Sequence, residues 1–275
     1  MYLEIAGKLL SESLLSLYPV FVKNIDLSLP IQLWSRFITY VLISGFFIDW
    51  SFVLEHIFSS NGLLLSGTTL LHVLTSYRGF QLLDSGIAWS LFYIYPLFIL
   101  MFSGQSIPPL LLLAPLGVIL LTTQKSESIT KSKHNENFLY EGILMILVAS
   151  LTEAIIYFLV RRLKTTNNWN HLFISYGFGM ILLSIFGFRE LGSLVSCKYS
   201  TVSWSLVLNS IIGLFGYYFR FFAATRLDPM IYAPLSYFGI IMAFVYGYVF
   251  NREKITWLQV VGVLLCIIPS LHEFL

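Results

Sequence analysis

The sequence predicts an all-α integral membrane protein with ten transmembrane helices, arranged as two inverted repeats of five helices. Three observations support this fold class: the composition, the recurrence of long apolar runs, and a similarity between the two halves. Hydrophobic residues make up 57% of the 275 residues and charged residues 11%, whereas an ordinary soluble domain carries about 25% charged residues. The composition therefore excludes a soluble enzyme, and the aromatic content of 17% excludes a disordered chain.

The apolar runs are continuous, as in PPLLLLAPLGVILL, and do not alternate with polar residues as the strands of a membrane barrel do. A helix needs about 20 largely apolar residues to cross a bilayer. Cutting the chain at its polar and charged clusters gives ten runs of this kind. The predicted spans are residues 6–22, 31–48, 61–80, 85–103, 107–123, 139–161, 169–187, 201–224, 229–250 and 255–273.

A polar stretch, QKSESITKSKHNEN at 124–137, is predicted to link a first repeat (1–123) to a second (138–275). The fourth and ninth of these runs support the repeat: Asp84 and Asp228 precede them, and aligning the two brings Tyr93 onto Tyr237. Five helices per half is an odd number, so halves of one fold must insert in opposite orientations. Inverted repeats are typical of alternating-access transporters, whose substrate site lies between the repeats near the bilayer midplane.

Two carboxylates fall inside predicted spans, where a charge costs about 2.5–3.5 kcal/mol. Glu12 lies in the first span and Glu153 in the sixth, which are the equivalent first helices of the two halves. An inverted fold would bring both to the central interface, where they could bind a cation or exchange protons. Alternatively, either Glu caps a helix, pairs with a buried Arg, or lies nearer the headgroups.

Other polar residues allow two interpretations each. Arg220 lies close enough to the end of its span to reach the headgroups, or it contacts substrate or a carboxylate. Arg36 and Arg78 lie near span ends and are expected to be interfacial anchors, whereas His72 and Asn209 are expected to form hydrogen bonds between helices. Aromatic residues could line a cavity or simply lie at the lipid interface. The candidates are Trp89, Tyr93, Tyr157, Tyr218, Tyr232 and Tyr237.

The ten-span layout resembles the drug/metabolite transporter superfamily, in particular its EamA-type permeases. The segments that carry this resemblance are GFQLLDSGIAWSLFYIYPLFILMF and ATRLDPMIYAPLSYFGIIMAFVYGYVFNREKITWLQVVGVLLCIIPS. The second resembles the closing helix pair of the family, with its short turn and the following Gly262. The resemblance implies cytoplasmic termini, although the distribution of Lys and Arg runs against the positive-inside rule.

A weaker similarity links AGKLLSES, LVASLTEAI and SGIAWSLFY to the small multidrug resistance proteins of the same superfamily. In those proteins a membrane-embedded Glu of the first helix is shared between protons and cationic substrates. The similarity implies such a role for Glu12 and Glu153, and it implies that Trp89 and Phe92 match the aromatic residues that stack on substrate.

We therefore expect a secondary transporter that moves a small metabolite by alternating access. The sequence has no GxxxxGK phosphate loop, so an ion gradient or exchange would supply the work. It also has no HExxH or GxSxG motif, which argues against a membrane-embedded enzyme; a receptor or assembly subunit is the remaining alternative. We expect no cofactor, no metal and no nucleic acid partner, a monomer or homodimer, and a multi-pass location in the plasma membrane.

Overall fold

A computed structural model describes residues 1–25, 27–105, 109–122, 135–186, 200–252 and 255–272. Within these residues every regular element is a helix. The helices are α1 (Tyr2–Leu15), α2 (Tyr18–Asn24), α3 (Leu29–Gly45), α4 (Trp50–His56), α5 (Ser60–Leu82), α6 (Ser85–Phe92), α7 (Tyr95–Phe102), the 3-10 helix η1 (Pro109–Leu112), α8 (Leu113–Thr122), α9 (Asn135–Arg162), α10 (Asn168–Phe186), α12 (Ser200–Ala224), α13 (Pro229–Ser236), α14 (Phe238–Asn251) and α15 (Trp257–His272).

Helices lie on all ten segments that the sequence predicts, but the described residues contain six that are long and apolar enough to cross a membrane. The count of candidate spans becomes seven if α4 and α5, which are bent by 87° at the break between them, are taken as one span. Helix α3 has 17 residues and α15 has 16, fewer than the roughly 20 of a typical span. Ten crossings therefore stay a prediction. The six are Tyr2–Val22, Ser85–Phe102, Phe138–Arg162, Asn168–Phe186, Trp204–Ala224 and Pro229–Asn251.

Helix α9 begins within the predicted linker, residues 124–137. Residues 135–137 already belong to α9, while 124–134 lie outside the described residues. The division into two repeats stays a prediction.

Three spans are broken near their middle. The first is divided into α1 and α2 and the fourth into α6 and α7, and in each a proline follows the last helical residue by four positions: Pro19 after Leu15, and Pro96 after Phe92. Proline has no backbone N–H to donate to the carbonyl four residues earlier, so the helix ends there. The ninth span is divided into α13 and α14 at Tyr237, three residues after Pro234.

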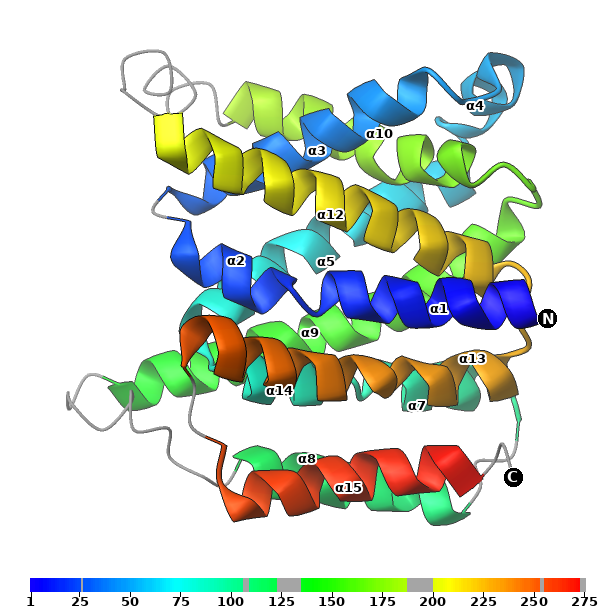
Figure 1. Ribbon diagram of the computed structural model, residues 1–275. Helices are drawn as coiled ribbons and strands as arrows, with labels where there is room; N and C mark the ends of the chain where they lie inside the picture. Colours follow the sequence, from blue (N-terminus) through cyan, green and yellow to red (C-terminus); the bar gives the residue numbers. More distant parts are fainter. Residues whose placement is uncertain (26, 106–108, 123–134, 187–199, 253–254, 273–275) are drawn as a thin grey trace.

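The helices form a bundle in which neighbours often come from different halves. Figure 1 shows the pair α3 and α10 at one edge, the pair α8 and α15 at the other, and α1, α12, α5 and α9 between them. Helix α1 packs on α12, and α9 packs on α5. The beginning of α1 and the end of α15 lie at the same end of the bundle. The centre of the bundle is thus lined by both halves.

Glycines allow α12 to pack closely on α1, and α9 on α5. A Cβ on Gly216 of α12 would lie 2.6 Å from Leu15 of α1, and one on Gly142 of α9 would lie 2.8 Å from Leu83 at the end of α5. Small residues at such contacts let helix backbones approach closely, which drives association where lipid supplies no hydrophobic force. These packings bring the polar side chains of α1, α9 and α12 within contact distance.

Candidate functional site

Lys8 and Glu12 lie one turn apart on α1 and are both fully buried. They form an ion pair, in which the ammonium donates to Glu12 Oε1. Lys8 also donates to the hydroxyl of Tyr95 at 3.1 Å, and its nitrogen lies 3.7 Å from the centre of the Tyr232 ring. Charge, hydrogen bond and cation–π contact together compensate Lys8 for the loss of water.

Arg220 of α12 joins the carboxylates of both halves. Its Nη2 lies 2.9 Å from Glu12 Oε2 and 3.1 Å from Oε1, and its Nη1 lies 2.8 Å from Glu153 Oε1. Arg220 is 1% exposed and Glu153 is 2% exposed. The planar guanidinium can donate in two directions at once, which is why Arg rather than Lys suits this bridging position. We call Lys8, Glu12, Glu153 and Arg220 the charge cluster.

The second oxygen of Glu153 faces His72 of α5 and Tyr217 of α12. Glu153 Oε2 lies 3.3 Å from His72 Nε2 and 3.3 Å from the Tyr217 hydroxyl. His72 Nδ1 lies 2.9 Å from the carbonyl oxygen of Ala149, which can only accept, so Nδ1 carries a proton. Nε2 lies 2.8 Å from the Tyr217 hydroxyl. Tyr217 can therefore donate either to neutral His72 or to Glu153.

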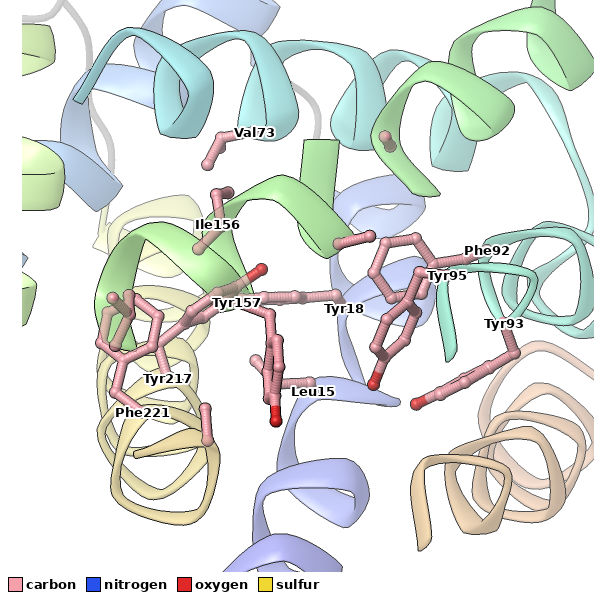
Figure 2. Packing of buried hydrophobic residues seen from close by; sticks show 14 of the residues in the cluster. Leu15, Tyr18, Val73, Phe92, Tyr93, Tyr95, Ile156, Tyr157, Tyr217 and Phe221 are labelled. Atoms are coloured by element: carbon pink, nitrogen blue, oxygen red, sulfur yellow. The ribbon is translucent and has the colours of Figure 1, made fainter. Parts of the chain in front are cut away.

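Two tyrosines after the break of the fourth span reach Glu12. Tyr93 donates to Glu12 Oε2, and the Tyr95 hydroxyl lies 3.3 Å from Oε1. Figure 2 shows the two rings side by side with their hydroxyl groups close together. Because the helix ends at Phe92 and restarts at Tyr95, both side chains can point to one carboxylate, which neighbours on a regular helix cannot do.

Trp89 and Phe92 lie beside the break in the first span. Trp89 donates from its ring nitrogen to Ser16 Oγ at 2.6 Å and stacks on Phe92 with ring centres 4.7 Å apart. The Ser16 hydroxyl is also 2.8 Å from the carbonyl oxygen of Gly239 in α14. These contacts tie the broken parts of the first, fourth and ninth spans together.

The other predicted aromatic residues differ in their relation to the charge cluster. Tyr232 lies under Lys8, and Tyr157 packs on Tyr232 with ring centres 4.8 Å apart. Tyr237 is buried with its ring centre 6.4 Å from that of Tyr93. Tyr218 is not brought to the charge cluster: it packs on Trp169 with ring centres 4.5 Å apart.

Tyr217, and not the predicted Tyr218, is the tyrosine of α12 that lies at the charge cluster. Successive residues of a helix point about 100° apart, whereas residues three apart share a face. Tyr217 is three residues before Arg220 and therefore faces the same carboxylates. The spacing of Tyr217 from Arg220 could have indicated this.

Sequence reasoning also missed Lys8, His72 and Tyr95 as members of the site. Lys8 lies four residues before Glu12, which is the spacing of a helical ion pair and was a usable signal. The contacts of His72 with the site could not be predicted from the sequence, because its partners Glu153 and Tyr217 come from distant segments.

The expectation that Arg36 is an interfacial anchor is wrong. Arg36 is the eighth of the 17 residues of α3 and is 1% exposed. Arg78 agrees better with that expectation, since it is 37% exposed and pairs with Glu141 across 2.7 Å. His72 and Asn209 do form hydrogen bonds between helices, the latter by donating to the Tyr77 hydroxyl at 3.0 Å.

The charge cluster is electrically balanced. Two carboxylates face one ammonium and one guanidinium. Where the structure describes the chain, no group of three His, Cys, Asp or Glu side chains is placed to hold a metal ion. The arrangement can exchange partners among its charges and move protons between oxygen and nitrogen atoms.

Residues 140–271 match the model of the EamA-like transporter family. The second half of this chain is therefore similar to an EamA-like transporter. The resemblance expected from the sequence is thereby confirmed for this half, and the family consists of membrane transporters of small solutes. The chain is an integral, multi-pass membrane protein.

A structural comparison covers both halves of the chain. One solved crystal structure is 15% identical in sequence and superposes with a TM-score of 0.64, over 98% of this chain and 94% of that one. At this identity the likeness concerns the fold alone. A search of curated proteins found no sequence match.

Proposed function

We propose that this protein is a secondary transporter, which moves a small solute across the membrane by alternating access between its two halves. The observation that carries the proposal is the Arg220 bridge. Glu12 comes from the first half, whereas Glu153 and Arg220 come from the second, and all three are buried at the junction. Buried ionisable groups in a membrane protein are expensive and are commonly functional.

The helix contacts support an inverted repeat. Exchanging the first five spans with the last five turns the contact of α1 with α12 into that of α9 with α5, and it leaves the pairs α3 with α10 and α8 with α15 unchanged. The ion contacts obey the same exchange: Glu12 lies against Arg220, and Glu153 lies against His72. Such symmetry is the usual basis of two alternating conformations.

The broken helices add to this argument. Spans four and nine are equivalent in the repeat, and they break at Tyr93 and at Tyr237, the two tyrosines that align in the sequence. Discontinuous helices at the midplane are where transporters of this architecture bind substrate and coupling ions. We place the solute path beside these breaks, with the aromatic residues Trp89, Phe92, Tyr93 and Tyr232 along it.

Transport can be tested by counterflow in proteoliposomes that contain the purified full chain. A panel of radiolabelled amino acids, amines, nucleotides, organic acids and sugar phosphates is offered to the wild type. The wild type should exchange at least one class of solute, and the double variant Glu12→Gln with Glu153→Gln should lose exchange by about 100-fold or more, as expected when a coupling site is removed. The variant Tyr218→Phe, away from the charge cluster, is the matched control and should retain exchange.

The opposite outcome is equally clear. If no solute moves, or if the double variant and Tyr218→Phe exchange solute at the same rate as the wild type, the transporter proposal fails. A protein that binds solute without moving it would instead be a receptor.

A further inference from the structure

A second buried cation lies outside the charge cluster. Arg36, in the middle of α3, is surrounded by five tyrosine rings, from α2, α3, α5, α10 and α12. Ring centres lie 4.6–5.6 Å from the guanidinium carbon. We call Tyr18, Tyr40, Tyr77, Tyr176 and Tyr217 the tyrosine cage.

Arg36 is poorly supplied with acceptors for its five N–H groups. It donates from Nη2 to the Tyr176 hydroxyl at 2.9 Å, while its buried Nε finds no acceptor within the described part of the chain. None of the described carboxylates forms an ion pair with it. The tyrosine rings offset part of the cost of burial, but a guanidinium without a counter-charge remains expensive at membrane depth.

The charges of the bundle interior therefore do not balance. The charge cluster is neutral, so Arg36 leaves one excess positive charge among the buried groups described. The group best suited to neutralise a guanidinium is an oxyanion, because its two oxygens accept parallel N–H bonds. The hydroxyls of Tyr18 and Tyr40 share one hydrogen bond at 2.5 Å, so one hydroxyl of this pair keeps a hydrogen to donate.

We propose that Arg36 and the tyrosine cage bind the anionic group, a carboxylate or a phosphate, of the transported solute. This assigns an organic anion or a zwitterion as the solute, and it rests on the proposed transport function. The rings pack around Arg36, so the anion enters when the halves move apart. Tyr217 connects the two sites, since its ring centre lies 4.9 Å from the Arg36 guanidinium and 5.4 Å from that of Arg220.

Binding is tested first, without transport. The purified full chain is placed in nanodiscs of phosphatidylcholine alone, so that no anionic lipid competes, and its thermal unfolding is followed with acetate, with inorganic phosphate, with neutral acetamide, and with chloride at equal ionic strength. At least one oxyanion should raise the Tm of the wild type above the chloride value, while acetamide should not. In Arg36→Gln this increase should disappear, and in the matched control Arg78→Gln it should persist.

Two further arms keep the test decisive. If Arg36→Gln fails to fold, Arg36→Lys replaces it. That variant keeps the charge but loses the planar guanidinium, so the oxyanion effect should fall, and an effect equal to that of the wild type would overturn the proposal. An arm with added phosphatidylglycerol shows whether a lipid phosphate gives the same Arg36-dependent stabilisation; if it does and soluble oxyanions do not, the site belongs to lipid and the proposal falls.

Transport separates this inference from the proposed function. With an anionic solute, Arg36→Gln should raise KM about tenfold or more, as loss of a charge-assisted contact predicts. If the wild type moves only amines or neutral solutes, or Arg36→Gln leaves KM unchanged, the anion site is overturned although transport stands. If nothing is transported but oxyanions still stabilise the wild type through Arg36, the transport proposal alone fails.

Discussion

Arg220 donates to both carboxylates of the charge cluster and is the only group described that touches Glu12 and Glu153 together. Its position illustrates why a buried ion pair need not make the folded protein more stable. Taking the four charges out of water costs several kcal/mol per ion, and their mutual attraction repays this only while every partner is present. Removal of one member should therefore be far worse than removal of an oppositely charged pair.

Replacing Arg220 by Gln should destabilise the protein by about 3–5 kcal/mol, because one carboxylate of the cluster is then left without a counter-charge. Replacing Arg220 and Glu153 together leaves the balanced pair of Lys8 and Glu12, so the double variant should recover much of this loss. Thermal unfolding of the purified variants measures both effects. If the double variant is less stable than Arg220→Gln by the full effect of Glu153→Gln alone, the two residues are not coupled.

The helix breaks are the feature of the elements that matters most for the site. In the first and fourth spans, the first helix (α1 or α6) ends four residues before a proline. Ser16 and Tyr93 lie at these breaks, and their side chains reach the centre of the bundle. The carbonyl of Phe92 is left without an N–H donor at Pro96. A single residue of the sequence, Pro96, therefore explains the break between α6 and α7.

Replacing Pro96 by Ala should lengthen α6 through the break, because an N–H becomes available for the carbonyl of Phe92. A continuous helix would turn Tyr93 and Tyr95 to different directions, so one of the two hydroxyl contacts with Glu12 is lost. We expect a folded protein whose solute exchange is at least about tenfold slower, the loss that corresponds to one hydrogen bond to a charged group. Unchanged exchange in counterflow, with the variant folded by thermal unfolding, would show that the break has no part in transport.

Sequence patterns predicted the helices well because the cost of exposed backbone and of charge in lipid leaves few choices. The same cost identified Glu12 and Glu153 as residues that need partners. The partners themselves come from packing: His72 and Arg220 lie on helices far away in the chain, and the face of α12 that is turned inward decided between Tyr217 and Tyr218. Arg36 was misplaced because α3 begins and ends a few residues earlier than the predicted span.

Under the proposed function, the charge cluster is the part of the whole molecule that couples proton binding to movement. Glu153 accepts from Arg220 on one oxygen, while its other oxygen faces Tyr217 and His72. A movement that separates α9 from α12 would break these contacts. Conversely, a proton on Glu153 weakens its hold on Arg220 and favours that movement, because binding and conformation are reciprocally linked.

If transport is proton-linked through Glu153, the variant Glu153→Gln should lose the pH dependence of exchange while it still folds. Glutamine keeps the shape of the side chain but takes up no proton. The rate of counterflow measured across pH should then be flat in this variant and sloped in the wild type and in Glu141→Gln, the control from the exposed Arg78 pair. A slope that persists in Glu153→Gln would place the coupling elsewhere.

Alternating access itself is tested most directly by chemical labelling from both sides of the membrane. Ser16, buried between Trp89 and Gly239 beside the charge cluster, is replaced by Cys in a chain whose Cys197 and Cys266 are replaced by Ser; Ser51→Cys, which is exposed at one end of the bundle, is the control. A membrane-impermeant maleimide is then applied to right-side-out and to inside-out vesicles. The account predicts that Ser16→Cys reacts from both sides and Ser51→Cys from one. Reaction of Ser16→Cys from one side alone, or from neither, would contradict it.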